Sequence, residues 1–388
     1  MRFANRLQAL QTNVFADMDR SKSQAIASGK TILDLSLGSS DLQASAVAIA
    51  TIEQSLHDPT THGYLLYHGT HDFREAVAHW YTQRFGIPVN PQTEVLPLIG
   101  SQEGTAHLPL AFLNPGDYAL LLDPGYPSHA GGVYLAGGQI YPMPLRSENQ
   151  FLPIFPDIPS SVLAKARLML LSYPHNPTTA IAPLSFFEEA VVFCEKHGLI
   201  LVHDFPYADI VFDGIASPPS IFQADRDKSL SIELFSFSKS YNMGGFRIGY
   251  AIGNAEIIKA LRQVKAVVDF NQYRGILNGA IAALQGSQET VKETVARFQK
   301  RRDTFIKALN NRGWPVDYPQ ATMYVWAKLP KPWERRSIEF CTELVAQTGV
   351  AVSPGAGFGQ QGEGYVRFAL VHEPPILELA VEKIAQFL

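Results

Sequence analysis

The sequence is poor in cysteine and has no marked excess of charge of either sign. Its 388 residues include only Cys194 and Cys341, which excludes a disulfide framework and a zinc site built from cysteines. Lys and Arg number 32 and Asp and Glu number 36, so the formal net charge is −4. A protein with this balance has no strongly basic surface for nucleic acid or for an anionic membrane, and we expect partners of neither kind.

Long apolar runs and low-complexity segments are also missing. No apolar run approaches the roughly 18 residues that a membrane span requires, and the opening MRFANRLQAL lacks the apolar core and the cleavage site of a secretory signal. Glycine and proline, at 29 and 26 residues, are used at close to average frequency. At roughly 150 residues per domain, the length indicates about two domains. We therefore expect a globular, cytoplasmic protein that is large enough to be an enzyme.

Short apolar runs alternate with helical stretches between about Leu96 and Gly253. Runs of this length, bounded by Pro, Gly or Asp, are typical of buried parallel strands. The runs are YALLLD (118–123), RLMLLSY (167–173), LILVHD (199–204), IELFSFS (232–238) and RIGYAIG (247–253). Between two of them, LSFFEEAVVFCEKHG (184–198) is patterned as a helix with a glycine stop. The alternation predicts an α/β fold in which helices cover both faces of a mostly parallel sheet.

The two ends of the chain are patterned differently from its middle. A helix is expected over about 14–28, followed by the apolar segment TILDLSL (31–37). Beyond a long helical region from about 256 to 312, strands are expected near MYVWAKL (323–329), VAVSP (350–354) and YVRFAL (365–370). We expect residues 39–280 to form a large α/β domain, and residues 1–38 and 281–388 together to form a smaller α+β domain.

Several motif-like segments lack the context that their motifs require. Residues 357–362 spell G-x-G-x-x-G, but this dinucleotide fingerprint should follow a strand and open a helix, and here a strand-like run follows it. Gly29-Lys30-Thr31 resembles the end of a phosphate-binding loop, but position 24 is Gln rather than Gly. His203 and Asp204 have no third metal ligand at a recognisable spacing, so we expect no metal site.

Polar residues stand where the predicted parallel strands end. In open parallel sheets, ligands bind outside the carboxyl ends of the strands. Asn176 follows one apolar run, Asp204 ends the next, and Lys239 follows the third. Their separations of 28 and 35 residues match one strand-helix unit each. An amide, an acid and a lysine are therefore expected along one edge of one sheet.

This set of residue types suits pyridoxal phosphate (PLP). A lysine amine is a good nucleophile only where desolvation or a nearby cation favours its neutral form. Arg247, eight residues after Lys239, supplies such a cation and a planar fork for phosphate. An acid such as Asp204 can keep a pyridine nitrogen protonated, which makes the ring an electron sink.

The stretch SFSKSYNMGGFRIG (236–249) resembles the lysine motif of class I/II aminotransferases, which have the PLP-dependent transferase fold of type I. HNPT (175–178) and HDFPY (203–207) resemble further motifs of this family, and the similarity covers nearly the whole chain in the expected order. The resemblance implies that Lys239 binds PLP covalently, that Asp204 faces the ring nitrogen, and that Asn176 and Tyr207 contact the ring oxygen.

The resemblance also implies the remaining contacts. Residues expected to bind the cofactor phosphate are Ser101, Gln102, Ser236, Ser238 and Arg247, the first two at a helix start where backbone N–H groups favour an anion. Tyr126, in DPGYPSH, is expected to stack on the ring. The substrate carboxylate is expected to meet Gly38, Asn176 and Arg367, with the arginine binding it through two hydrogen bonds.

A tyrosine in YLLYHG suggests shared active sites. In the family that the chain resembles, one such tyrosine reaches the cofactor phosphate of a neighbouring subunit. Tyr64 fits its spacing to Gly69 better than Tyr67 does, which predicts a homodimer. The alternative is that Tyr64 packs locally against Phe73 and Trp80.

LSLGSSDL (35–42) and the run from Gly100 to His129 resemble the LL-diaminopimelate aminotransferase group. The chain has Gln102 where that group often carries Lys, and 41–44 lacks a proline common nearby, so the substrate stays open. Arg274 could meet a distal substrate carboxylate or be a surface helix residue.

We expect a PLP-dependent aminotransferase acting on an L-amino acid and a 2-oxo acid, with LL-diaminopimelate and 2-oxoglutarate as a candidate pair. The alternatives are a PLP-dependent C–S β-lyase of the same fold and a catalytically silent regulatory protein.

Overall fold

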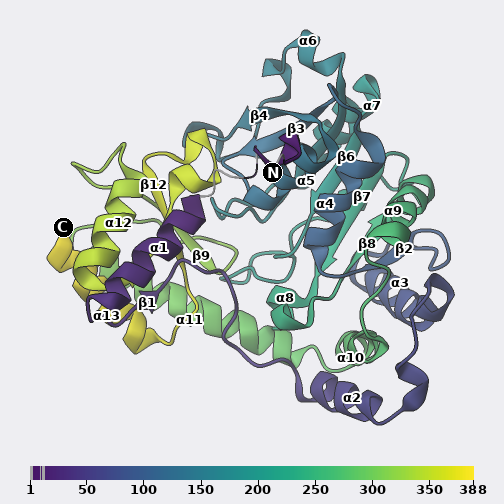
Figure 1. Cartoon of the computed structure of the whole chain (residues 1–388), viewed down its shortest axis with the longest axis horizontal. Helices are drawn as coiled ribbons and strands as arrows, with labels where there is room; N and C mark the ends of the chain where they lie inside the picture. Colours follow the sequence, from purple (N-terminus) through teal and green to yellow (C-terminus); the bar gives the residue numbers. More distant parts are fainter. Residues whose placement is uncertain (1–2, 9, 11–13) are drawn as a thin grey trace.

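The computed structural model describes residues 3–8, 10 and 14–388. Figure 1 shows two lobes side by side, with the long helix α11 extending beneath both. The helices are α1 (Val14–Ala27), α2 (Ala46–Leu56), α3 (His71–Phe85), α4 (Ser101–Phe112), α5 (Pro127–Ala136), α6 (Ser160–Leu163), α7 (Leu184–His197), α8 (Phe237–Ser240), α9 (Ala255–Val268), α10 (Arg274–Gln285), α11 (Glu289–Asn311), α12 (Ser337–Thr348) and α13 (Pro374–Phe387). The strands are β1 (Leu33–Asp34), β2 (Val95–Leu98), β3 (Tyr118–Asp123), β4 (Gln139–Pro144), β5 (Ala166–Leu171), β6 (Ile200–Asp204), β7 (Ser231–Ser236), β8 (Gly249–Gly253), β9 (Tyr324–Lys328), β10 (Val350–Ala351), β11 (Ser353–Pro354) and β12 (Tyr365–Ala369).

The larger lobe contains a seven-stranded sheet in the order β2-β8-β7-β6-β5-β3-β4. Five of these strands, β7, β6, β5, β3 and β4, are parallel to one another, which confirms the predicted mostly parallel α/β architecture. The run RIGYAIG was expected to be parallel, and this is wrong: β8 is antiparallel to both β7 and β2. The 237–248 connection holds only the four-residue helix α8 and a 3-10 turn at Gly244–Phe246, so the chain does not cross back along the sheet before β8.

Helices cover both faces of this sheet. Successive strand side chains point to opposite faces, and in β5 Leu168 and Leu170 pack in one core cluster while Met169 and Leu171 pack in another. The first cluster includes residues of α4, α5 and α9, and the second includes residues of α3, α7 and α10. The parallel strands are therefore buried on both sides, and their carboxyl ends are left to form the site.

The smaller lobe brings the two ends of the chain together. An antiparallel sheet has the order β11-β12-β9, and β1 pairs in parallel with β10 through Leu33–Val350 and Asp34–Ala351. Residues of α1, α11, α12 and α13 share its core. The helical region expected over 256–312 is divided into α9, α10 and α11. Among the described residues, no helix combines the length and apolar character of a membrane span.

Candidate active site

Lys239 lies directly beyond the carboxyl end of β7, in the short helix α8. Its ammonium Nζ donates a hydrogen bond to the carbonyl oxygen of Gly38 and lies 5.8 Å from the centre of the Tyr207 ring. A Cβ at Gly38 would collide with the hydroxyl of Tyr324. Glycine at this position therefore allows the segment after β1 to lie directly against the Tyr324 ring.

Asp204 is the last residue of β6 and is buried. Its Oδ2 lies 3.0 Å from Nε2 of His129, whereas its Oδ1, also buried, has no hydrogen-bond partner among the described residues. A buried carboxylate oxygen is costly to leave unpaired. The arrangement is suited to a further N–H donor, such as a protonated pyridine nitrogen.

Arg367, on β12, is buried between two aromatic rings and three hydrogen-bond acceptors. Its guanidinium lies 4.3 Å from the centre of the Tyr324 ring and 4.6 Å from that of Phe358. It donates to Asn176 Oδ1 at 2.8 Å, to the Ser36 carbonyl at 2.7 Å and to Ser353 Oγ at 3.3 Å. Its Nε has no partner among the described residues. The guanidinium is thus fixed in orientation next to Asn176, with donor capacity left for an anion.

Two buried tyrosines join Lys239 to Arg367. The hydroxyls of Tyr207 and Tyr324 are 2.9 Å apart. Burial raises the pKa of Tyr207 well above its ordinary value. Burial also acts to raise the pKa of Tyr324, but the charges of Lys239 and Arg367 and the hydrogen bond with Tyr207 lower it overall. The positive charges of Lys239 and Arg367 therefore favour the ionised form of Tyr324.

Two histidines extend the site behind Asp204. His129 also makes an edge-on contact with Tyr126, with ring centres 5.5 Å apart. His175 is buried, and its Nδ1 lies 2.7 Å from Thr178 Oγ1. Burial, with a smaller effect of His129, lowers the pKa of His175 to about 3. His175 is therefore a neutral ring at physiological pH.

A turn between β2 and α4 gathers the residues expected to bind phosphate. Gly100 precedes Ser101, the first residue of α4, with a φ of 75° that favours glycine. A Cβ at Gly100 would lie 2.6 Å from an Arg247 nitrogen. Gly249 of β8 pairs with Leu98 on one side and with Ser236 on the other, which brings the end of β7 next to this turn. Ser236 Oγ accepts the backbone N–H of Ser238. Gln102 is exposed in the first turn of α4, where the N-terminal N–H groups can receive an anion.

Tyr64 is not part of this cluster. It is 95% exposed, which contradicts the alternative of local packing against Phe73 and Trp80. Tyr67 is engaged within the chain, because its hydroxyl donates to the Gln92 carbonyl and its ring lies beneath two arginines. Arg274, at the start of α10, lies against Gly69 in the same loop as Tyr64.

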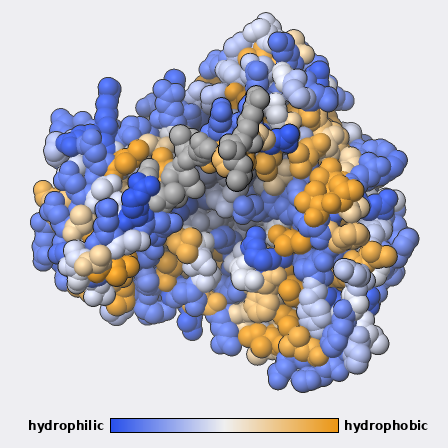
Figure 2. Space-filling model, viewed as in Figure 1, coloured by the Kyte–Doolittle hydropathy of each residue, from blue (hydrophilic) through white to orange (hydrophobic). Residues whose placement is uncertain are grey.

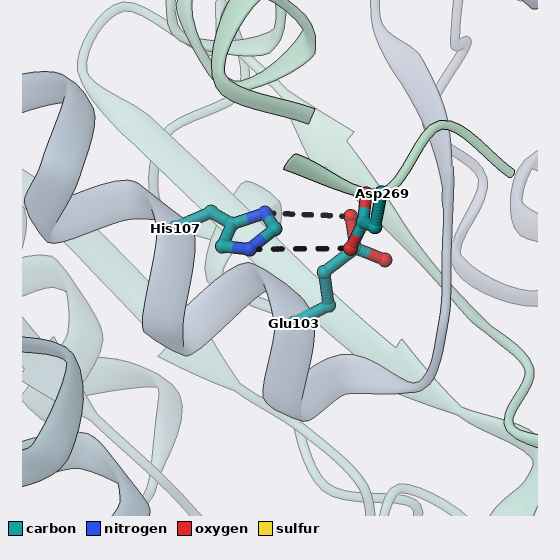
Figure 3. A group of neighbouring side chains, drawn as sticks. All are labelled: Glu103, His107 and Asp269. Atoms are coloured by element: carbon teal, nitrogen blue, oxygen red, sulfur yellow. Dashed lines mark ion pairs between the residues drawn. The ribbon is translucent and has the colours of Figure 1, made fainter. Parts of the chain in front are cut away.

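A cluster of ionisable groups lies between α4 and the end of α9. Figure 3 shows His107 and Glu103 on successive turns of α4 and Asp269 just after α9, with the two carboxylates together on one side of the histidine ring. The three residues are spaced closely enough to hold a metal ion. However, the Lys265 ammonium lies 2.8 Å from Glu103 and 3.4 Å from Asp269. The chain's own ammonium therefore already pairs with both carboxylates.

The described residues fit PLP. Asp204 offers an unpaired oxygen for the ring nitrogen, Lys239 offers an amine, and the α4 turn with Arg247 offers an anion site. His129 and Tyr324 were not anticipated from the sequence. His129 lies three residues after Tyr126 at the start of α5, a helical spacing that could have indicated it, but Tyr324 lies within an apolar strand and gives no signal.

Comparisons with known proteins agree on one family. The model of the family "Aminotransferase class I and II" matches residues 30–384. An LL-diaminopimelate aminotransferase of Dehalococcoides mccartyi is 43% identical over 100% of this chain and 99% of its own length. An LL-diaminopimelate aminotransferase 2 of Nostoc sp. is 41% identical over 99% and 98%. The structure of a probable N-succinyldiaminopimelate aminotransferase from Thermus thermophilus is 41% identical, with a TM-score of 0.91 over 97% of this chain and 100% of that one.

Proposed function

The chain belongs to the class I and II aminotransferases, and on this basis we propose that it moves an amino group from LL-diaminopimelate to a 2-oxo acid such as 2-oxoglutarate, using PLP bound at Lys239. The fold is the type I fold of PLP-dependent transferases, as the sequence predicts. The observation that carries the cofactor assignment is the buried Oδ1 of Asp204, at the end of β6, which has no partner among the described residues. It calls for an N–H donor, and a protonated pyridine nitrogen is such a donor.

Each residue of the site has a role in this proposal. PLP, when bound, supplies a conjugated ring that withdraws electrons from the substrate Cα. Asp204 holds a proton on the ring nitrogen, and His129 orients Asp204. Lys239 acts as the general base that removes the proton from the substrate Cα. Arg367 binds the α-carboxylate, with Asn176 fixing the guanidinium in place.

The remaining residues hold the cofactor in place. Tyr126 stacks on the ring, and Tyr207 and Asn176 donate to its phenolic oxygen. The phosphate is bound by Ser101, Gln102, Ser236, Ser238 and Arg247. Gly38, whose carbonyl accepts a hydrogen bond from Lys239, would contact the substrate carboxylate through its backbone, and a side chain at this position would collide with Tyr324.

We also propose a homodimer in which Tyr64 reaches the phosphate of the partner's cofactor. Figure 2 shows apolar surface over α2 and α10. The exposed apolar residues of α2, of the Tyr64 loop and of the segment at the end of α9 include Val47, Leu56, Leu66, Val267, Val268 and Phe270. A surface of this kind is typical of a subunit interface. A tyrosine that is 95% exposed on the single chain is free to enter a neighbouring site.

The names of the relatives support LL-diaminopimelate as the amino donor. The two curated relatives are named for it, whereas the Thermus structure is named for its N-succinyl derivative. These substrates differ at the distal nitrogen, which is charged in one and acylated in the other. We therefore propose that the site accepts a substrate whose distal amine is free rather than acylated.

A single-turnover panel tests this function. The purified PLP-loaded protein is mixed without acceptor with LL-diaminopimelate, N-succinyl-LL-diaminopimelate, L-glutamate or L-cysteine. We expect LL-diaminopimelate to convert the cofactor absorbance to that of pyridoxamine phosphate fastest. Faster conversion by the succinylated substrate would overturn the donor assignment. Release of ammonia and pyruvate from cysteine, with no pyridoxamine phosphate, would instead show a lyase. No change with any amino acid would show a catalytically silent protein.

A further inference from the structure

A buried ion pair ties the β2–α4 turn to helix α9. Lys265 Nζ of α9 donates to Glu103 Oε1 at 2.8 Å and to Oε2 at 3.0 Å. Both side chains are at least 96% buried. The carboxylate of Glu103 also accepts the backbone N–H of Ile99, which lies in the turn that contains Gly100. The ion pair therefore holds the backbone just before the N-terminus of α4.

The segment after α9 supports the same turn from a second side. The amide Nε2 of Gln272 donates to the Leu98 carbonyl at 3.2 Å and to the Arg247 carbonyl at 3.1 Å. Leu98 is the last residue of β2, and Arg247 is the cation proposed to bind phosphate. Gln272 thus links the end of β2 to Arg247, although Gln272 is not itself proposed to bind the phosphate.

Charge explains why Glu103 needs Lys265. Glu103 lies only two residues beyond Ser101, so its negative charge is close to the place where a phosphate would bind. Burial opposes the charged carboxylate, but His107, Lys265 and the Ile99 N–H together lower the pKa of Glu103. Without Lys265, a charged carboxylate would be left unneutralised beside a second anion.

We propose that Lys265 and Glu103 are positioning residues that fix the shape of the phosphate-binding turn, and that Lys265 also cancels the carboxylate charge next to the bound phosphate. This inference rests on the proposed function, because it presumes that the turn receives the phosphate of PLP. The pair acts through the backbone of residues 99–101 and does not touch the cofactor itself. A phosphate-specific loss of affinity is the signature that distinguishes this role from a general structural one.

The test compares PLP with pyridoxal, its analogue without phosphate. The dissociation constants of both are measured by absorbance titration of the apoprotein. Both ligands carry the aldehyde that reacts with Lys239, so a change in the ratio of the two constants reports on the phosphate alone. Lys265→Met is expected to weaken PLP binding by roughly tenfold and to leave pyridoxal binding nearly unchanged. The matched control is Lys259→Met, which removes an exposed lysine paired with Glu256 on the same helix and should change neither constant.

A double variant keeps the proposal testable if Lys265→Met folds poorly. Glu103→Gln added to Lys265→Met removes the carboxylate charge next to the turn, while the glutamine oxygen can still accept the Ile99 N–H. We expect the double variant to recover most of the lost preference for PLP, as well as the thermal stability. Equal losses of affinity for PLP and pyridoxal, or no recovery in the double variant, would overturn the positioning role. A rise in the melting temperature of the wild type on addition of zinc would also overturn it, because Glu103, His107 and Asp269 would then form a metal site. If the wild-type protein binds neither ligand, the proposed function itself fails.

Discussion

At the scale of single residues, the unpaired oxygen of Asp204 gives the sharpest expectation. Asp204→Asn keeps the volume of the side chain but cannot hold a proton on a pyridine nitrogen by charge. We expect this variant to bind PLP while its kcat falls by at least about a hundredfold, since the electron sink is lost. Steady-state kinetics with a spectroscopic count of bound PLP is the measurement. An unchanged kcat at full PLP occupancy would show that Asp204 is only structural.

His175 predicts a pH dependence of stability. Its pKa is about 3 in the folded protein, against an ordinary value of about 6.5. Between these values the unfolded chain binds more protons than the folded one, so the free energy of unfolding falls as the pH drops below about 6.5, by up to about 1.4 kcal/mol per pH unit. Urea unfolding at several pH values should show a shallower fall for His175→Asn. His79→Asn, at an exposed position of α3, is the control and should follow the wild type. Parallel curves for all three proteins would contradict the assignment.

The residues that stand at the ends of strands could be predicted from the sequence. The residues that reach the site only through the packing of other elements could not. Asp204 does end β6, and Lys239 does follow β7, because a strand end can be recognised from an apolar run. His129 and Tyr324 come from α5 and β9. Their approach to the site depends on how the helix sits on the sheet and how the smaller lobe meets the larger, which no local pattern encodes. The roles of all these residues stay predictions until they are tested.

At the scale of elements, the start of α4 depends on the conformation of Gly100. A methyl group at this position would be strained by the φ of 75° and would also meet Arg247. We expect Gly100→Ala to weaken PLP binding by at least roughly tenfold, because the phosphate turn must shift. The readout is the dissociation constant for PLP at equal folded fraction.

Gly86→Ala supplies the matched control for Gly100→Ala. Gly86 has a φ of 69° at the end of α3, and a Cβ there would meet nothing within 4 Å. This variant should lose about 1 kcal/mol of stability from backbone strain alone and keep its affinity for PLP. Similar losses of PLP affinity in both variants would show that strain, rather than the shape of the phosphate turn, is responsible.

Two strands of the large sheet escaped prediction because they contain proline. β2 carries Pro97, and β4 carries Pro142 and Pro144. Proline cannot donate to a strand ladder and is found mainly on edge strands, and these two strands are the edges of the sheet. The central parallel strands have the apolar runs that identify buried strands, so the sequence predicted the middle of the sheet better than its borders.

At the scale of the whole molecule, the proposed shared sites predict complementation between two damaged chains. Lys239→Ala and Tyr64→Ala proteins should each be weak or inactive. In a heterodimer of the two, one site carries both lesions and the other carries neither. Refolding an equal mixture should therefore restore about a quarter of wild-type activity, since half of the dimers are mixed and each has one intact site. Activity assays and sedimentation before and after mixing are the measurements.

Tyr67→Phe is the control for this experiment. The Tyr67 hydroxyl donates to the Gln92 carbonyl of its own chain, so the Tyr67→Phe protein should be active without a partner. When it is mixed with Lys239→Ala, the only active sites should be those that the Tyr67→Phe chains already provide. If mixing Tyr64→Ala with Lys239→Ala restores nothing, Tyr64 serves its own chain. A fully active monomer in sedimentation would end the shared-site proposal.

The pairing of the chain's two ends also sets the order in which the protein can be completed during synthesis. Ser36 and Ser353, which both contact Arg367, are 317 residues apart in sequence. At typical elongation rates of about 5 to 20 residues per second, the segment that carries Ser36 and Gly38 would wait roughly 15 to 60 seconds on the ribosome before its partners emerge. The strands and helices of the large sheet are all synthesised in that interval. The carboxylate-binding arginine is thus among the last parts to be made, and a chain that stalls before β12 would have a finished large sheet but no place for its substrate.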